Sequence, residues 1–414
     1  MIKDLFSKKW GIVSVLVLLL FGQLVYSFLY PSVGLDDNWQ PISQYLQKFS
    51  VEGSDNFLLS TGLSFVSPNY RLNSDVGHYL ELAKDFSPQY FAESPFMERP
   101  LYPLMIFLAS LPLRIFAPAS YGMIFAASML VNFALISAAV ILFFFLLQKI
   151  FSPKVAWLSS ILLIFSPFVH SYINQPLAEM LMAFAVVLAG YLLYNYAKDA
   201  SSVKLVVFSL IIGLLMLGKM FFAISFFILL LALYFRRLRE GAVFAVMHLL
   251  PFLFWYIWTT KIWHIAYRTH QMTDWDMGVW IFRIFSMPWQ KTYEIFLALA
   301  PNFISALIYA FLLFPVVFSI IGLRQMHFKH KNIVYFSAIL AVFGLGFLAK
   351  FFYIRHVFLL FPLIYPAAVL GIEETAKYAA RGRQWIRLLL YAMLIGFIII
   401  VSNIDIYRVF DYNL

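Results

Sequence analysis

Cysteine is absent from this chain, and charged side chains are scarce. Without cysteine the protein has no disulfides, no thiolate nucleophile and no cysteine-ligated metal. Charged residues make up 12% of the 414 positions, against about a quarter in soluble domains, whereas hydrophobic residues make up 63%. These proportions exclude an ordinary soluble domain and predict an integral membrane protein. Polar chemistry must come from carboxylates, histidine, lysine, arginine and tyrosine.

The common signatures of nucleotide binding, zinc proteases, serine hydrolases and EF-hands are also missing from the loops. The net charge of +10 is explained by basic loops on one side of a membrane, so no nucleic-acid partner is expected. No internal repeat or low-complexity linker divides the chain. We therefore expect a single membrane domain over residues 1–414.

Long apolar runs fill most of the chain, and a run of about 20 residues can cross a hydrocarbon core of roughly 30 Å. We expect an all-α polytopic fold with about eleven transmembrane helices. The first run follows basic residues but is long and lacks a small-residue cleavage site, so it is interpreted as a retained anchor. The expected spans are residues 10–30, 121–148, 155–173, 177–197, 204–218, 220–235, 242–258, 294–322, 332–349, 357–371 and 385–402.

The distribution of lysine and arginine sets the expected orientation, because short cytoplasmic loops are enriched in both. A cytoplasmic N-terminus places Lys149, Lys154, Lys198 and Lys204 in the cytoplasm. Segment 101–116 is short and proline-containing, so we expect it to lie at the outer interface without crossing. Two long loops then face the periplasm: residues 31–120, with juxtamembrane helices, and residues 259–293. The lack of a soluble domain favours a bacterial inner membrane.

A polar helix is expected from Asn73 to Phe86, in the first long loop. Asp75 falls in its first turn, where the helix dipole favours an ionised carboxylate that suits a base or a cation partner. An ordinary amphipathic surface helix explains the same pattern. Helical spacing puts on one stripe Asp75, His78, Tyr79, Leu82 and Phe86.

The order of polar residues in this loop resembles that of a known family of enzymes. Asp75, Tyr79 and Glu81 are followed by Glu98-Arg99-Pro100, and this pattern resembles the GT-C membrane glycosyltransferases, in particular the protein O-mannosyltransferase and lipid A aminoarabinose transferase group. Val76 stands where that family often has a second acid, so a paired-carboxylate role at this point is not expected.

Later segments resemble the same family in the same order. Residues 166–184, 213–222 and 352–374 are similar to its later motifs, although Gln175 stands at a position that is often acidic and His356 replaces a tyrosine. The resemblance covers most of the chain. Residues 36–70 have no counterpart and are interpreted as an insertion.

The resemblance implies an inverting glycosyltransferase with a GT-C-like fold. It would move a sugar from a polyprenyl-phosphate donor to a hydroxyl of a lipid, glycan or protein acceptor at the outer face of the membrane. Asp75 would be the catalytic base. Outer-turn cations need an anion, so Lys219 and Arg355 are expected to hold the donor phosphate; snorkelling to ordinary lipid headgroups is the alternative for Lys219. The other expected substrate-binding residues are Tyr79, Glu81, Glu98, Arg99, Glu179 and His356.

Several alternatives stay open. Glu98 and Arg99 could form an ion pair within the loop, and Glu179 could be a paired packing residue. Asp274 and Asp276 form an Asp-x-Asp pair of the kind that holds divalent metals, but two carboxylates rarely fill a metal shell, so no metal or other cofactor is expected.

Two other classes of protein compete with the enzyme. A transporter or flippase for a lipid-linked sugar should have charged or broken spans near mid-membrane. A non-catalytic assembly protein should tolerate loss of Asp75. Membrane lipids are expected partners in every case.

Overall fold

The computed structural model describes residues 9–29, 39–41, 71–73, 76–94, 99–115, 121–218, 236–265, 288–326 and 357–380, with a few positions between 385 and 396. Within these ranges the chain is helical apart from one short two-stranded ribbon. Five helices there are long and apolar enough to cross a membrane, or six if one bent pair counts as a single span. The predicted helical class is confirmed, and the long apolar helices are those expected of a membrane-embedded protein. The full set of about eleven spans stays a prediction, because several expected spans lie outside the described residues.

The helices with spanning length are α2 (Lys9–Leu29), α8 (Tyr121–Ile150), α11 (Glu179–Lys198), α14 (Leu238–Ile257) with its π-helical continuation η5 (Trp258–Ile262), and α20 (Phe361–Ala380) with the preceding 3-10 turn η7 (Phe358–Leu360). The bent pair consists of α16 (Trp289–Phe311) and α17 (Leu313–Leu323). Shorter apolar helices are α9 (Pro153–Ile164), α10 (Pro167–Tyr172) and α12 (Ser202–Met216). The first long loop contains α5 (Val76–Lys84), α6 (Pro88–Glu93), α7 (Leu101–Ser110) and the 3-10 turn η4 (Leu113–Ile115).

Two Ser-Pro pairs explain how the span expected over 155–173 is built. Ser152 begins α9 and Ser166 begins α10: each hydroxyl accepts a hydrogen bond from the backbone N–H three residues on, at 3.3 and 3.2 Å. The proline that follows takes the first helical position, where an N–H would have no helical partner. The expected single helix is therefore two helices, α9 and α10, joined at Phe165 and Ser166.

Glycine allows two pairs of helices to pack backbone against backbone. A Cβ added to Gly371 on α20 would lie 1.9 Å from the carbonyl oxygen of Phe318 on α17, and one added to Gly322 would lie 1.8 Å from that of Ala367. Gly213 on α12 meets the carbonyl oxygen of His248 on α14 in the same way, at 2.1 Å. Small residues of this kind permit the close helix crossings on which membrane proteins depend.

The span expected over 294–322 also differs from the structure, because it is divided at Leu312. This residue has a backbone φ of 64°, in the left-handed region that residues other than glycine rarely adopt. The axes of α16 and α17 differ by 107° across it. Pro315 lies in the first turn of α17, where proline is tolerated, and it could not have continued α16 without removing a helical hydrogen bond.

A short ribbon closes part of the first long loop. Strand β1 (Trp39–Pro41) pairs antiparallel with β2 (Arg71–Asn73), so that Trp39 lies opposite Asn73. The two ends of segment 42–70 are therefore neighbours, and β2 leads towards α5.

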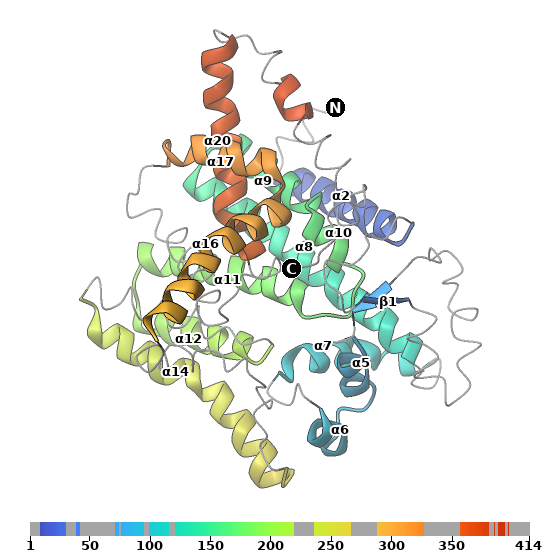
Figure 1. The fold of residues 1–414 in the computed structure, drawn as a ribbon. Helices are drawn as coiled ribbons and strands as arrows, with labels where there is room; N and C mark the ends of the chain where they lie inside the picture. Colours follow the sequence, from blue (N-terminus) through green and yellow to red (C-terminus); the bar gives the residue numbers. More distant parts are fainter. Residues whose placement is uncertain are drawn as a thin grey trace.

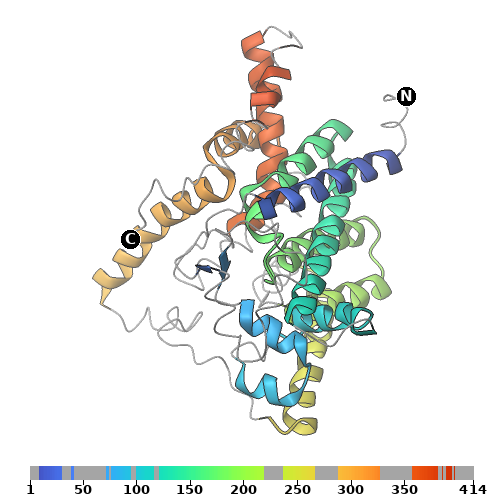
Figure 2. The ribbon, with the colours of Figure 1, turned by 90° about the vertical axis from the view of Figure 1, so that its right-hand side faces the viewer.

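Figure 1 shows how the elements are distributed along the molecule. The loop helices α5, α6 and α7 gather at one end with the C-terminal part of α14, while α20 extends towards the opposite end. Figure 2, turned by 90°, shows the same separation. The helices of the first loop thus form a cap on one end of the bundle.

Candidate functional site

Tyr79 is the first of the expected site residues that the structure describes. It is buried on α5 and meets the ring of Tyr102 on α7 edge to face, with ring centroids 5.3 Å apart. Leu82 is buried on the same face, but His78 is exposed. The expected stripe was therefore too wide: neighbouring residues on a helix point about 100° apart, and the packing against α7 selects Tyr79 rather than His78.

Arg114 fixes α5 against the short turn that follows α7. Its guanidinium donates hydrogen bonds to the carbonyl oxygens of Lys84 at 2.8 Å and Ala83 at 3.3 Å, at the C-terminal end of α5. A cation at this end of a helix is favoured because the last carbonyls have no helical partners and carry the negative end of the dipole. Helix α5, which carries Tyr79, is therefore held by the ring of Tyr102 and by the guanidinium of Arg114.

Tyr102 lies at the centre of a buried hydrogen-bond chain. Its side chain is fully buried, and its hydroxyl donates to Oδ1 of Asn132 on α8 at 2.8 Å. The amide of Asn132 in turn donates to the carbonyl oxygen of Gln175 and lies 3.4 Å from that of Ile173. One side chain of α8 therefore joins the loop helix α7 to residues 173–178, which we call the α10–α11 connection.

The first helix of the chain holds the same connection from another side. Asn174 donates to the carbonyl oxygen of Ser27 on α2 at 3.0 Å, and Gln23 contacts Nδ1 of His170 at 3.1 Å. All of these polar side chains are buried. Irregular backbone at membrane depth needs such partners, because lipid offers none. Asn132 serves backbone carbonyls of the connection itself, while Asn174 and Gln23 fasten α2 to it.

Glu179 follows this connection and begins α11, with only 1% of its surface exposed. The position in the first turn favours a negative charge, because the free N–H groups and the helix dipole point towards it. Burial raises the pKa of the Tyr102 phenol well above its ordinary value, and the nearby Glu179 carboxylate and Tyr79 raise it further. Tyr102 is therefore a neutral hydrogen-bond donor beside a carboxylate at ordinary pH.

The end of α12 joins the same region. The backbone N–H of Leu101, directly after Arg99-Pro100, donates to the carbonyl oxygen of Leu217 at 3.1 Å. Gly218 packs so closely on Leu181 of α11 that an added Cβ would lie 2.3 Å from its side chain. The motif around Arg99, the start of α11 and the end of the Gly-rich segment 213–218 are therefore in contact.

The depth of this cluster follows from the length of α8. Helix α8 has 30 residues, or about 45 Å at 1.5 Å per residue. Asn132 lies about 26 Å along the axis from Lys149, close to the roughly 30 Å thickness of a hydrocarbon core. Lys149 also contacts Asn195 near the end of α11, so α11 returns from the α10–α11 connection to the level of Lys149. The connection and Lys149 therefore lie about 26 Å apart along α8, a separation close to the thickness of one hydrocarbon core.

Four aromatic rings join the first loop to the end of α14. Phe91 is fully buried against Trp255 and Trp263, with centroids 5.3 and 5.5 Å away, and Phe86 lies 4.8 Å from Phe91. Trp255 and Trp263 contact each other at 5.4 Å. Trp263 thus packs in an aromatic cluster that fixes the cap to the bundle.

The remaining expected residues fall into two groups. Glu81 is partly exposed, and its carboxylate lies 3.9 Å from His78, on a different side of α5 from Tyr79. Arg99 is half-buried at the start of the contact with Leu217. Outside the described residues lie Asp75, Glu98, Lys219, Arg355 and His356, together with Asp274 and Asp276. Their described chain neighbours Val76, Gly218 and Val357 are buried.

Comparison with models of known protein families gives no match, and comparison with curated proteins gives none either. Among the residues that the structure describes, no group of three or more histidine, aspartate or glutamate side chains could hold a metal ion.

Sequence reasoning missed Tyr102 and Asn132, which link the expected residues to one another. A signal existed for Asn132, because an amide inside an apolar span is costly unless it faces protein, and it is often a helix-to-helix contact. Tyr102 offered no signal of its own in a segment that contains many aromatic residues.

Proposed function

We propose that this protein is an inverting membrane glycosyltransferase that uses a polyprenyl-phosphate sugar and an acceptor hydroxyl at the outer face of the membrane. One observation carries the proposal. Tyr79, the Arg99–Tyr102 segment, Glu179 and the end of α12 come from four separate parts of the sequence, and they converge on one buried polar cluster. These are the parts in which the sequence resembles that enzyme family.

The depth of the cluster supports transfer at a membrane surface over transport through the bilayer. A transporter would place its broken helix near the middle of the membrane. The α10–α11 connection is a break, but it lies at the level of Asn132, about 26 Å from Lys149 along α8. With Lys149 at the headgroups of one leaflet, that level suits a sugar whose lipid phosphate sits among the headgroups of the other. We therefore favour the enzyme over the flippase.

In the proposed reaction, Asp75 takes the proton of the acceptor hydroxyl as its oxygen forms a bond to C1 of the sugar. The bond from C1 to the phosphate oxygen breaks at the same time, and the polyprenyl phosphate leaves with the electron pair. Lys219 and Arg355 stabilise the charge on the departing phosphate. Glu179 binds a hydroxyl of the sugar or the acceptor, and Tyr102 and Asn132 keep Glu179 in position.

The test is transfer by the purified protein in lipid nanodiscs with a matched polyprenyl-phosphate sugar. Asp75→Asn should lower kcat by about 10²–10⁴-fold, the usual contribution of a general base. Glu179→Gln should lower kcat/KM by about 10–100-fold, because hydrogen bonds to a charged group are worth about 1.5–3 kcal/mol. Lys219→Met should weaken donor binding.

Asp85→Asn is the matched control, because Asp85 is exposed just beyond the end of α5. It should change neither kcat nor KM by more than about twofold. Normal turnover by Asp75→Asn in a preparation that binds donor would remove Asp75 from the mechanism. If no polyprenyl-phosphate sugar is turned over, but a lipid-linked sugar crosses the bilayer in vesicles, the flippase is correct.

A further inference from the structure

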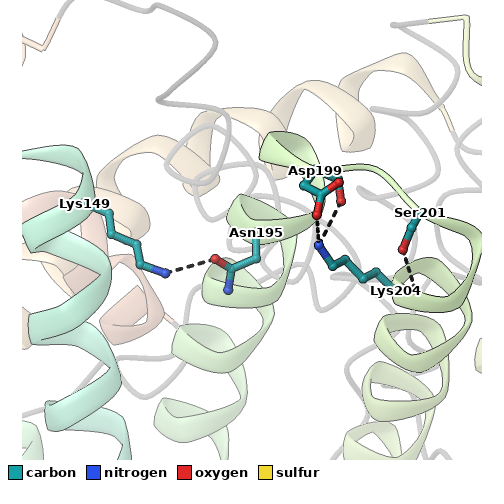
Figure 3. A network of polar contacts seen from close by, with 5 residues as sticks. All are labelled: Lys149, Asn195, Asp199, Ser201 and Lys204. Atoms are coloured by element: carbon teal, nitrogen blue, oxygen red, sulfur yellow. Dashed lines mark hydrogen bonds and ion pairs between the residues drawn. The ribbon is translucent and has the colours of Figure 1, made fainter.

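Lys149 lies in the last turn of α8, about 26 Å along the helix from Asn132. Its ammonium donates to the hydroxyl of Tyr191 at 3.1 Å and to Oδ1 of Asn195 at 3.0 Å, both on α11. It also lies 4.2 Å from the ring centroid of Tyr191 and 5.8 Å from that of Tyr194. Figure 3 shows Lys149 reaching from α8 across to Asn195. The side chain is thus held in one place although it is exposed.

The partners of Lys149 differ in kind from those of four other cations, each of which pairs with a carboxylate. Lys204 pairs with Asp199, as Figure 3 also shows, and Lys154 pairs with Glu373. Arg237 and Lys377 pair with the glutamates three residues away on their own helices. The groups that hold Lys149 are neutral, so its positive charge is oriented but not compensated.

An ammonium has three N–H groups, and two of those of Lys149 are used by Tyr191 and Asn195. Among the described residues no acceptor takes the third. Tyrosine and lysine together are typical of the headgroup layer, where the ring faces the apolar chains and the cation faces phosphate. The position about 26 Å from Asn132 along α8 is the level at which the second leaflet would have its phosphates.

We propose that Lys149, with Tyr191, Tyr194 and Asn195, is a binding site for the phosphate of an anionic phospholipid in the leaflet opposite to the α10–α11 connection. The chemistry is a charge-assisted hydrogen bond from the third N–H to a phosphate oxygen. A bound lipid would lie against the ends of α8 and α11 together. This inference does not depend on the proposed function.

The test compares the full chain in nanodiscs of phosphatidylcholine alone with nanodiscs that also contain phosphatidylglycerol, and counts retained phosphatidylglycerol by native mass spectrometry. Lys149→Gln should weaken retention about fivefold, the factor that corresponds to about 1 kcal/mol for one cation at a membrane surface. Lys149→Arg should restore most of it. Lys204→Gln removes the same charge from the same side, but Asp199 already compensates that charge, so its effect should stay below about twofold.

Tyr191→Phe separates a built site from general surface charge. It leaves the net charge unchanged but removes one of the groups that hold the ammonium, so retention should fall about two- to threefold. Retention equal to that of the wild type in Tyr191→Phe, or equal losses in Lys149→Gln and Lys204→Gln, would mean that only overall charge matters and would overturn the proposal.

Thermal denaturation in both kinds of nanodisc gives a second arm. Phosphatidylglycerol should raise the Tm of the wild type and of Lys204→Gln but not that of Lys149→Gln. A Tm loss of the same size for Lys149→Gln with and without phosphatidylglycerol would assign Lys149 to the end of the α8 dipole alone, and the lipid site would be wrong.

Discussion

The hydrogen bond between Tyr102 and Asn132 can be measured by a double-mutant cycle. Tyr102→Phe removes the hydroxyl but keeps the ring that contacts Tyr79. Interhelical hydrogen bonds in membranes average about 0.6 kcal/mol, and buried ones in soluble proteins about 1 kcal/mol. We expect Tyr102→Phe to lower the free energy of unfolding by about 1 kcal/mol.

Asn132→Leu should cost more, because it leaves several groups without a partner. The Tyr102 hydroxyl loses its acceptor, and the carbonyl oxygen of Gln175 loses its donor. Each buried polar group left unsatisfied costs about 1–3 kcal/mol, so the loss for these two groups should be about 2–6 kcal/mol. In the double variant the orphaned hydroxyl is gone, and the two losses should overlap by about 1–2 kcal/mol.

The assay is reversible unfolding in mixed micelles, titrated with dodecyl sulfate, for the wild type, both single variants and the double variant. Ser128→Ala is the control on the same helix, because its buried hydroxyl donates only to the carbonyl of Phe125 one turn away. It should change stability by less than about 0.5 kcal/mol. Strict additivity of Tyr102→Phe and Asn132→Leu would show that the two side chains do not interact, and the account of the site would fail with it.

Three further predictions test the fold and its electrostatics. Gly371→Ala should lower the Tm and cost at least about 1–3 kcal/mol, because the added Cβ meets a backbone carbonyl. Gly22→Ala, whose added Cβ has nothing within 4 Å, should be neutral or stabilising. Equal Tm values for the two variants would contradict the close crossing of α17 and α20. Because the pKa of Tyr102 is raised in the folded state, its contribution to stability is complete below pH about 10, where the unfolded tyrosine begins to titrate, and is lost as pH rises further. Tyr102→Phe should therefore lose less stability than the wild type between roughly pH 10 and 12. Identical alkaline losses in unfolding titrations would show that Tyr102 is not a buried phenol with a raised pKa. In the naturally cysteine-free chain, Ser54→Cys and Ser120→Cys should react with an impermeant maleimide added outside and Ser202→Cys should not; labelling of Ser54 and Ser120 on opposite sides would mean that 101–116 crosses the membrane.

Composition was sufficient to predict the helices that are apolar all round. The expected runs 10–30 and 121–148 correspond to α2 and α8 within two residues at each end. Lipid removes the alternatives for such a segment, because its backbone can find hydrogen bonds only within a helix. The break at Leu312 could not be read in this way, since the hydrophobic run continues across it and only Pro315 marks a possible start of a new helix.

The candidate site could be predicted only in part. Glu179 and Tyr79 stand out as polar or amphipathic residues near the ends of apolar runs. The link through Asn132 could not be recognised in the sequence. Its partners include backbone carbonyls some forty residues away, and every residue has a carbonyl. Side-chain-to-backbone contacts leave no complementary residue in the sequence to recognise.

The ribbon at the base of the first loop has a practical consequence for work on this protein. Because Trp39 and Asn73 are paired, residues 42–70 enter and leave at one point. The entropic cost of closing a loop changes by only about 0.6 kcal/mol for each doubling of its length. We therefore expect this segment to tolerate replacement by a two-residue turn, an epitope or a small fluorescent domain while β1 and β2 stay paired before α5. The same position would suit a fiducial marker for electron cryomicroscopy.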